Sequence, residues 1–98
     1  MKRREILEKA SACVCGERDQ QYGKPEDNFG LIARLWNDYL QGSQTKGSPV
    51  RLDIISSRDV AAMLALLKIA RIRGGQKHPD NWVDIAGYAA CGGEIEGE

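Results

Sequence analysis

The sequence predicts an all-α protein, folded as a compact four-helix bundle-like domain, and three observations lead to that class. Apolar residues recur at intervals of three and four over four segments, which is the spacing of one face of an α-helix. The connections between them are rich in Gly, Pro and Ser, and no segment shows a convincing strand pattern. Because the chain has 98 residues, we expect a single helical domain over residues 1–98, with a flexible loop at residues 41–49.

The first two helices are predicted from apolar stripes and from the residues at their ends. The first runs over residues 2–18, and Gly16 weakens its end. The second begins near Pro25, whose fixed φ suits a first helical position, and Glu26 and Asp27 are favourable beside the positive helix end. Their apolar faces are Ile6, Leu7, Ala10, Cys13 and Val14 in the first helix, and Phe29, Ile32, Ala33, Leu35, Trp36 and Leu40 in the second.

The third and fourth helices follow the loop. Ser56, with Asp59 three residues later, is typical of a capping box in front of a helix over residues 57–73. That third helix is apolar on nearly every side, which predicts the central position in the bundle. The fourth helix is expected from about Pro79 to Cys91, where a pair of glycines ends it and a short acidic tail frays.

Charge and composition exclude several classes of protein. The 14 basic and 14 acidic residues cancel, which argues against a protein that coats long nucleic acid. No apolar run approaches the ~20 residues of a membrane span, and no apolar h-region follows the charged N-terminus. We therefore expect a cytoplasmic protein with no membrane association. A domain of this size buries only about 60–65% of its unfolded surface, which predicts a homo-oligomer.

The cysteines and the histidine give no enzymatic template. Cys13, Cys15 and Cys91 lack Cys-x-x-Cys spacing, and we expect them to be buried, reduced thiols. No Walker-type loop and no Gly-x-Ser-x-Gly elbow is present. His78, which precedes Pro79 at a helix start, is more typical of a surface residue than of a catalytic one.

Two acids on the fourth helix and two bases on the third form the candidate site. Asp80 and Asp84 are spaced i, i+4 on one polar line that continues to Tyr88. Lys68 and Arg71, spaced i, i+3, interrupt an otherwise apolar helix. The short connection between the two helices predicts antiparallel packing, which brings the acids and bases to one groove.

Two interpretations of these charges stay open. In the first, Asp80 and Asp84 are metal ligands, because Mg²⁺ prefers carboxylate oxygens, and Lys68 and Arg71 bind a phosphate. In the second, the acids and bases only neutralise each other as structural ion pairs, because a charge near a core face needs a partner. The mid-helix position of Asp84 cannot be explained by capping.

A second candidate region precedes the second helix. Tyr22 and Lys24 lie in a compact turn there, and the backbone N–H groups of the following helix can receive an anion. Tyr22 and Tyr88 are candidates for stacking on a base. Trp36 and Trp82 could also stack on a base, but core packing explains them better.

Four motifs together resemble a family of small phage and prophage proteins of unassigned function. They are Asp19 to Phe29, Arg58 to Met63, Leu67 to Arg71 and Asp80 to Tyr88. More distantly, the motifs are similar to the nucleotide-modification-associated and MazG-like all-α nucleotide pyrophosphatases. In those groups a Tyr-Gly turn follows the first helix, a Lys-x-x-Arg lies on a central helix, and acids on the last helix help to hold Mg²⁺ and nucleotide phosphates.

The resemblance implies a nucleotide ligand, and three function hypotheses follow. The first is a phage-type binder without catalysis that sequesters nucleotide signals in the host cell cytoplasm. The second is a Mg²⁺-dependent, MazG-like nucleoside triphosphate pyrophosphohydrolase, and the third is a helical interaction protein without a ligand. We favour the first, because MazG-like enzymes cluster four acids on two helices, whereas the second helix here has no acid between Asp27 and Asp38.

Overall fold

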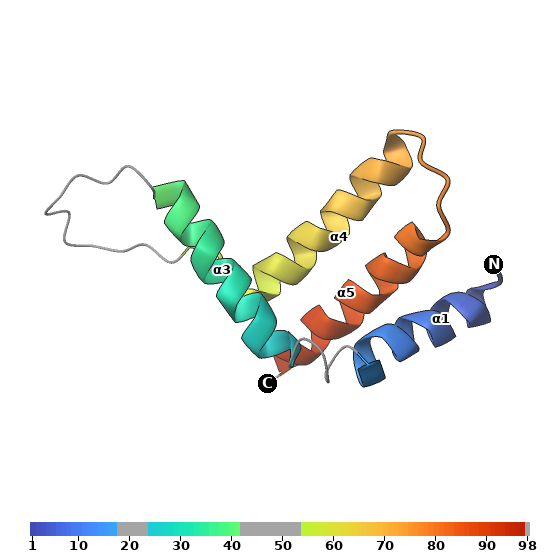
Figure 1. Cartoon of the computed structure of the whole chain (residues 1–98), viewed down its shortest axis with the longest axis horizontal. Coiled ribbons are helices and arrows are strands. Elements are labelled where there is room, and N and C mark those ends of the chain that lie inside the picture. Colours follow the sequence, from blue (N-terminus) through green and yellow to red (C-terminus); the bar gives the residue numbers. More distant parts are fainter. Residues whose placement is uncertain (18–23, 42–53, 98) are drawn as a thin grey trace, which may run out of the picture.

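The structure is a computed structural model that describes residues 1–17, 24–41 and 54–97. Four α-helices and one π-helical turn make up the regular structure of these ranges, and the predicted all-α class with a compact four-helix arrangement is confirmed (Figure 1). Tyr22 and, apart from Gln41, the loop predicted at residues 41–49 lie outside the described residues. The elements are α1 (Arg3–Ala12), η1 (Cys13–Glu17), α3 (Pro25–Gln41), α4 (Ser57–Arg73) and α5 (Asp80–Gly97).

The first predicted helix is split into two kinds of helix. It begins at Arg3, close to the predicted start, and is α-helical only to Ala12. The next five residues, Cys13–Glu17, form the wider π-helical turn η1. Gly16, the weakest helix former of this segment, lies inside that turn.

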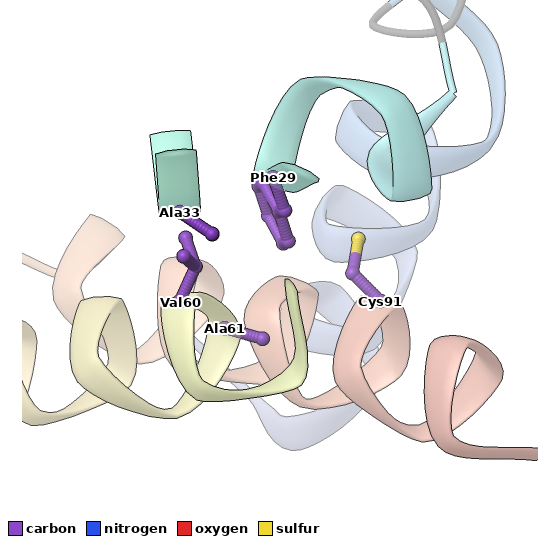
Figure 2. Close-up of a cluster of buried hydrophobic side chains, with 5 residues drawn as sticks. All are labelled: Phe29, Ala33, Val60, Ala61 and Cys91. Carbon is purple, nitrogen blue, oxygen red and sulfur yellow. The ribbon is translucent and has the colours of Figure 1, made fainter. Parts of the chain in front are cut away.

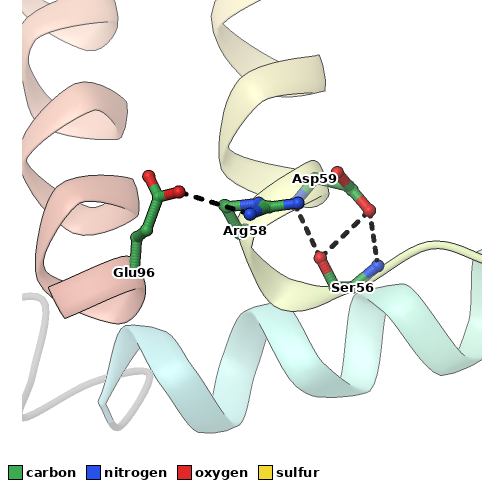
Figure 3. A network of polar contacts seen from close by, with 4 residues as sticks. All are labelled: Ser56, Arg58, Asp59 and Glu96. Atoms are coloured by element: carbon green, nitrogen blue, oxygen red, sulfur yellow. Dashed lines mark hydrogen bonds and ion pairs between the residues drawn. The ribbon is translucent and has the colours of Figure 1, made fainter. Parts of the chain in front are cut away.

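α4 begins with the capping box that the sequence predicts (Figure 3). The Ser56 Oγ accepts a hydrogen bond from the Asp59 N–H at 3.2 Å, and the Asp59 carboxylate accepts one from the Ser56 N–H at 2.9 Å. The backbone N–H and then the hydroxyl of Ser56 lower the pKa of the Asp59 carboxyl, because both bonds favour its charged form. The cap therefore fixes the N-terminal end of α4.

A short turn joins α4 to α5 and reverses the chain. The Gly74 N–H donates to the Ala70 carbonyl at 2.9 Å and closes α4. Gly75 follows with φ of 97°, a left-handed conformation that favours glycine. α4 and α5 are therefore antiparallel neighbours, and α1 lies along the opposite side of α5 (Figure 1).

α5 is longer than predicted, and it takes the central place in the bundle that was predicted for α4. It continues through Gly92 and Gly93 to Gly97, so the predicted end at Cys91 is wrong. A Cβ at Gly92 would lie 3.0 Å from the Ala61 Cβ of α4, and a Cβ at Gly87 would lie 3.1 Å from the Val14 Cγ1 of η1. These glycines let two neighbours approach α5 closely. The central helix is therefore α5, and the prediction that α4 is central is wrong.

The core lies where α3 crosses the hairpin of α4 and α5 (Figure 2). Phe29 and Val60 are its fully buried large side chains, and Cys91 of α5 packs beside them. Asn37 of α3 is also buried and holds the chain in front of α4. Its Nδ2 donates to the Ile55 carbonyl at 2.9 Å, and its Oδ1 accepts from the Ile55 N–H at 3.0 Å.

Several residues predicted to be buried are exposed. Cys91 is buried as predicted, but Cys13 and Cys15, which lie in the π-helical turn, are exposed. Leu7 of α1 is 63% exposed, because α1 covers α5 with Ala10 and Ile6 instead. The larger exception is on α4, where four large apolar side chains are 41–61% exposed. They are Met63, Leu66, Leu67 and Ile69.

Candidate functional site

One of the predicted acid–base contacts is present between α4 and α5. The Lys68 Nζ lies 2.8 Å from the Asp84 Oδ2, and the two side chains are 13% and 35% exposed. The predicted antiparallel packing therefore brings one base and one acid into direct contact. This contact is the ion pair that the second interpretation of the sequence expects, and the role of either residue toward a ligand stays a prediction.

The cavity next to this ion pair is small. Asp84 and Tyr88 line it together with Val14 of η1, and its volume is about 50 Å³. Such a volume holds a few waters, since a single water needs roughly 10–15 Å³ by the same measure. Ligand sites for small molecules are typically about 300–1,000 Å³. A nucleotide would therefore need more room than this cavity offers.

Asp80 belongs to a different environment, one turn before Asp84. Its side chain is 60% exposed, and its Oδ2 lies 3.7 Å from the His78 Nδ1. The Asp80 N–H donates to the same His78 nitrogen at 3.2 Å, so that nitrogen acts as an acceptor at the start of α5. Within the described residues there is no group of three or more His, Cys, Asp and Glu side chains placed to hold a metal ion. Mg²⁺ binding by Asp80 and Asp84 stays a prediction.

The remaining predicted residues lie at two ends of the molecule. Lys24 is exposed immediately before α3, where its carbonyl accepts the Asp27 and Asn28 N–H groups. The first turn of α3 lies beside the C-terminal end of α5, whereas the turn between α4 and α5 is at the far end of the hairpin (Figure 1). Arg71 is exposed close to that turn. The structure thus brings Lys68, Arg71, Asp80 and Asp84 to one half of the hairpin and leaves Lys24 at the other end.

A ligand-sized hollow lies at the turn between α4 and α5. Its volume is about 310 Å³, and Lys77, His78 and the indole of Trp82 line it together with Ile72, Gly75, Gln76 and Pro79. The segment beneath it is tied down by the buried Asn81, whose Nδ2 donates to the Gln76 Oε1 at 2.8 Å. The turn therefore places one aromatic residue and one lysine at the wall of this hollow.

Sequence reasoning missed this hollow because it placed Trp82 in the core. Trp82 is 56% exposed, so that expectation is wrong. The stripe of α5 that packs toward η1 is Val83, Gly87 and Cys91, at i, i+4 and i+8, and Trp82 lies to one side of it. That small-residue stripe was the signal in the sequence that could have shown Trp82 to be outside the packed face.

The fold and the hollow together define an all-α protein built on a helical hairpin, and comparison with known proteins gives its family. Residues 5–96 match the model described as Domain of unknown function (DUF6378), and the chain belongs to this family. It is also similar to the Gene 55 protein of Mycobacterium phage D29, with 42% identity over 86 residues, covering 88% of this chain and 50% of the relative. The Gene 55 protein of Mycobacterium phage L5 is 40% identical over 84 residues, covering 86% of this chain and 47% of the relative.

These matches confirm the predicted resemblance to a family of phage proteins of unassigned function. The chain spans about half the length of the curated relatives it matches. No solved structure matches it. The more distant MazG-like similarity is not shown by these matches and stays a prediction. In the part of the chain that the structure describes, no helix has the length and apolar character needed to cross a membrane.

Proposed function

We propose that this chain binds a nucleotide or a nucleotide-derived phosphate ligand in the hollow at the turn between α4 and α5. The observation that supports this most is the pairing of an exposed indole with a lysine around a space of about 310 Å³. A base can stack on the face of Trp82, which is worth roughly 1–3 kcal/mol for a nucleic-acid base on an aromatic side chain. The phosphates would then lie toward Lys77.

The charge of this end of the hairpin suits an anion. Between residues 71 and 80 the exposed basic side chains are Arg71, Arg73 and Lys77, whereas Asp80 is the single acidic residue. An excess of positive charge raises the local concentration of an anionic ligand and speeds its association. The backbone of Arg71 borders the same turn, since its carbonyl accepts the Gln76 N–H at 3.0 Å. The predicted phosphate role of its guanidinium is part of this proposal.

Binding without hydrolysis, and therefore sequestration, is the form of this function that we propose. Mg²⁺ commonly uses one or two carboxylates together with phosphate oxygens, so Asp80 could join a metal to a bound phosphate. The Asp84 carboxylate is held by Lys68 at 2.8 Å, and a metal there would have to compete with that contact. The support for a binder is the sequence, in which the second helix lacks the acids of the MazG pattern.

A fluorescence titration tests the proposal. The chain has two tryptophans, so Trp36→Phe leaves Trp82 as the single indole. Titration of this variant with linear and cyclic nucleotides, with and without Mg²⁺, should give saturable quenching by at least one of them. The reciprocal variant, Trp82→Phe, should keep Trp36 emission unchanged by the same ligand. If no nucleotide quenches Trp82 and calorimetry detects no heat of binding, the proposal is wrong.

Substitutions at the turn then locate the phosphates. Losing one charge-assisted phosphate contact costs roughly 1.5–3 kcal/mol of binding, so Lys77→Ala and Arg71→Ala should each weaken affinity about tenfold or more. Lys9→Ala, an exposed lysine on α1, is the matched control and should bind as the parent does. If Arg71→Ala binds the nucleotide as tightly as the parent, Arg71 does not contact the ligand. If Lys77→Ala binds as tightly as the parent, the hollow is not the binding site.

A further inference from the structure

The outer side of α4 is a continuous apolar surface. From Val60 to Ala70 the single charged residue is Lys68, and its Nζ points to Asp84 of α5 at 2.8 Å. The outer side of α4 is exposed from residue 62 to residue 70, over about two and a half helical turns. We call it the bare face of α4, and it consists of Ala62, Met63, Leu66, Leu67, Ile69 and Ala70.

Exposure of this kind is unusual for a helix in water. Leu66 is 61% exposed, Ile69 49%, Leu67 47% and Met63 41%. A helix that is apolar on every side is normally buried on every side, and contiguous apolar patches on a protein surface typically mark interaction sites. α5, by contrast, covers only the side of α4 that carries Ala61 and Lys68.

The spacing along the bare face is that of a helix-packing seam. Met63, Leu66 and Ala70 are separated by three and then four residues, which is the a–d–a pattern that one helix presents to another. The same row continues to Asp59 at one end and Arg73 at the other. Each of these charges lies seven residues from Leu66, so the seam is apolar in the middle and oppositely charged at its two ends.

The charges at the two ends of the seam favour a second copy of α4 as the partner helix, and they favour antiparallel packing. In an antiparallel pair of α4 helices with a two-fold axis at Leu66, Asp59 of each copy lies opposite Arg73 of the other copy. In a parallel pair, Asp59 would face Asp59 and Arg73 would face Arg73, which repels. Both hydrogen bonds from Ser56 to the Asp59 carboxylate use Oδ2, so the bonds of the cap do not involve the second oxygen. Closed two-fold symmetry is also the commonest form of a homo-oligomer.

We propose that the bare face of α4 is a homodimer interface, in which α4 of a second copy packs antiparallel around a two-fold axis at Leu66. The interface is self-complementary: apolar residues meet at the centre, and Asp59 pairs with Arg73 of the other copy at each end. This inference gives the predicted homo-oligomer a defined surface. It does not depend on the nucleotide site.

Sedimentation of matched variants tests the interface. The parent at micromolar concentration should sediment with twice the 10.8 kDa mass of one chain. Leu66→Glu places two carboxylates at the axis and should give a helical monomer. Leu7→Glu on α1, a leucine of nearly the same exposure (63% against 61%), should remain a dimer. A monomeric parent, or a Leu66→Glu variant that stays dimeric, would overturn the proposal.

Disulfide trapping tests the direction of the two helices. In a background in which Cys13 and Cys15 are Ser, Leu66→Cys should form an inter-chain disulfide with diamide as the oxidant. Arg73→Cys should not, because two copies of residue 73 would be 14 residues apart along the antiparallel seam, or about 21 Å at 1.5 Å per residue. Efficient trapping through Arg73→Cys, with or without trapping through Leu66→Cys, would contradict the antiparallel arrangement.

Discussion

α4 and α5 form one hairpin, but they contribute to the fold in different ways. α4 carries large aliphatic side chains on nearly every side, yet four of them are 41–61% exposed. α5 carries glycines and alanines and is packed by α4 on one side and by α1 and η1 on the other. Small residues let neighbours come close, so the helix with the smaller side chains is the one at the centre. Large aliphatic side chains on a helix indicate that another element packs on it, but they do not indicate that this element belongs to the same chain.

The largest expected effect comes from the core that α3 builds on the hairpin. Phe29 is fully buried against α4 and α5. Phe29→Ala should lower the free energy of unfolding by about 3–5 kcal/mol, because it removes a buried ring and leaves a cavity. Leu31→Ala is the control on the same helix, since Leu31 is 55% exposed, and it should change stability by no more than about 0.5 kcal/mol. Urea unfolding followed by circular dichroism measures both, and equal losses would contradict this description of α3.

The ion pair between the two helices should have the next largest effect. Lys68→Ala leaves the Asp84 carboxylate without its partner at 2.8 Å, and a hydrogen bond to a charged group is worth roughly 1.5–3 kcal/mol. The double substitution Lys68→Met with Asp84→Leu should recover most of that loss, because apolar pairs replace such ion pairs well. Asp80→Ala should cost little, since Asp80 and His78 are about 60% exposed.

Asp84→Asn separates the two interpretations of the pair. A clear loss of stability with unchanged nucleotide binding assigns the pair to the fold alone. Intact stability together with weaker binding assigns Asp84 to the ligand site. Thermal unfolding and calorimetry on the same variant give both results.

The capping box should have a smaller effect, limited to the start of α4. Ser56→Ala removes the hydroxyl that accepts the Asp59 N–H and should lower stability by about 1 kcal/mol. Ser57→Ala changes the next residue, the first of α4, without removing the cap and should leave the melting temperature close to that of the parent. Similar losses in both variants would show that the cap contributes little.

Local features of the fold could be predicted from the sequence, whereas features that depend on several helices could not. The capping box at Ser56 and Asp59 involves neighbouring residues, and it was predicted correctly. So was the antiparallel hairpin, because its connection is short. Gly92 was interpreted as the end of a helix, since local propensity favours that role, but packing against Ala61 outweighs propensity.

The candidate site divides in the same way. Lys68 and Asp84 were placed in one groove because their helices were expected to pack antiparallel, and they meet at 2.8 Å. The exposure of Trp82 depends on which two sides of α5 are covered, and that is decided by α4 on one side and by α1 and η1 on the other. A single-helix pattern contains no such information, so the hollow beside Trp82 was missed.

The central claim is that close contact at the small residues of α5 organises the fold, and adjacent glycines test it most directly. A Cβ added at Gly92 would lie 3.0 Å from the Ala61 Cβ, whereas a Cβ added at Gly93 would have no neighbour within 4 Å. Both positions are helical, so each alanine gains about 0.5–1 kcal/mol from helix propensity. Thermal unfolding should show Gly93→Ala with a raised melting temperature and Gly92→Ala with a lowered one, because α4 must move away. Two melting temperatures raised by the same amount would contradict the claim.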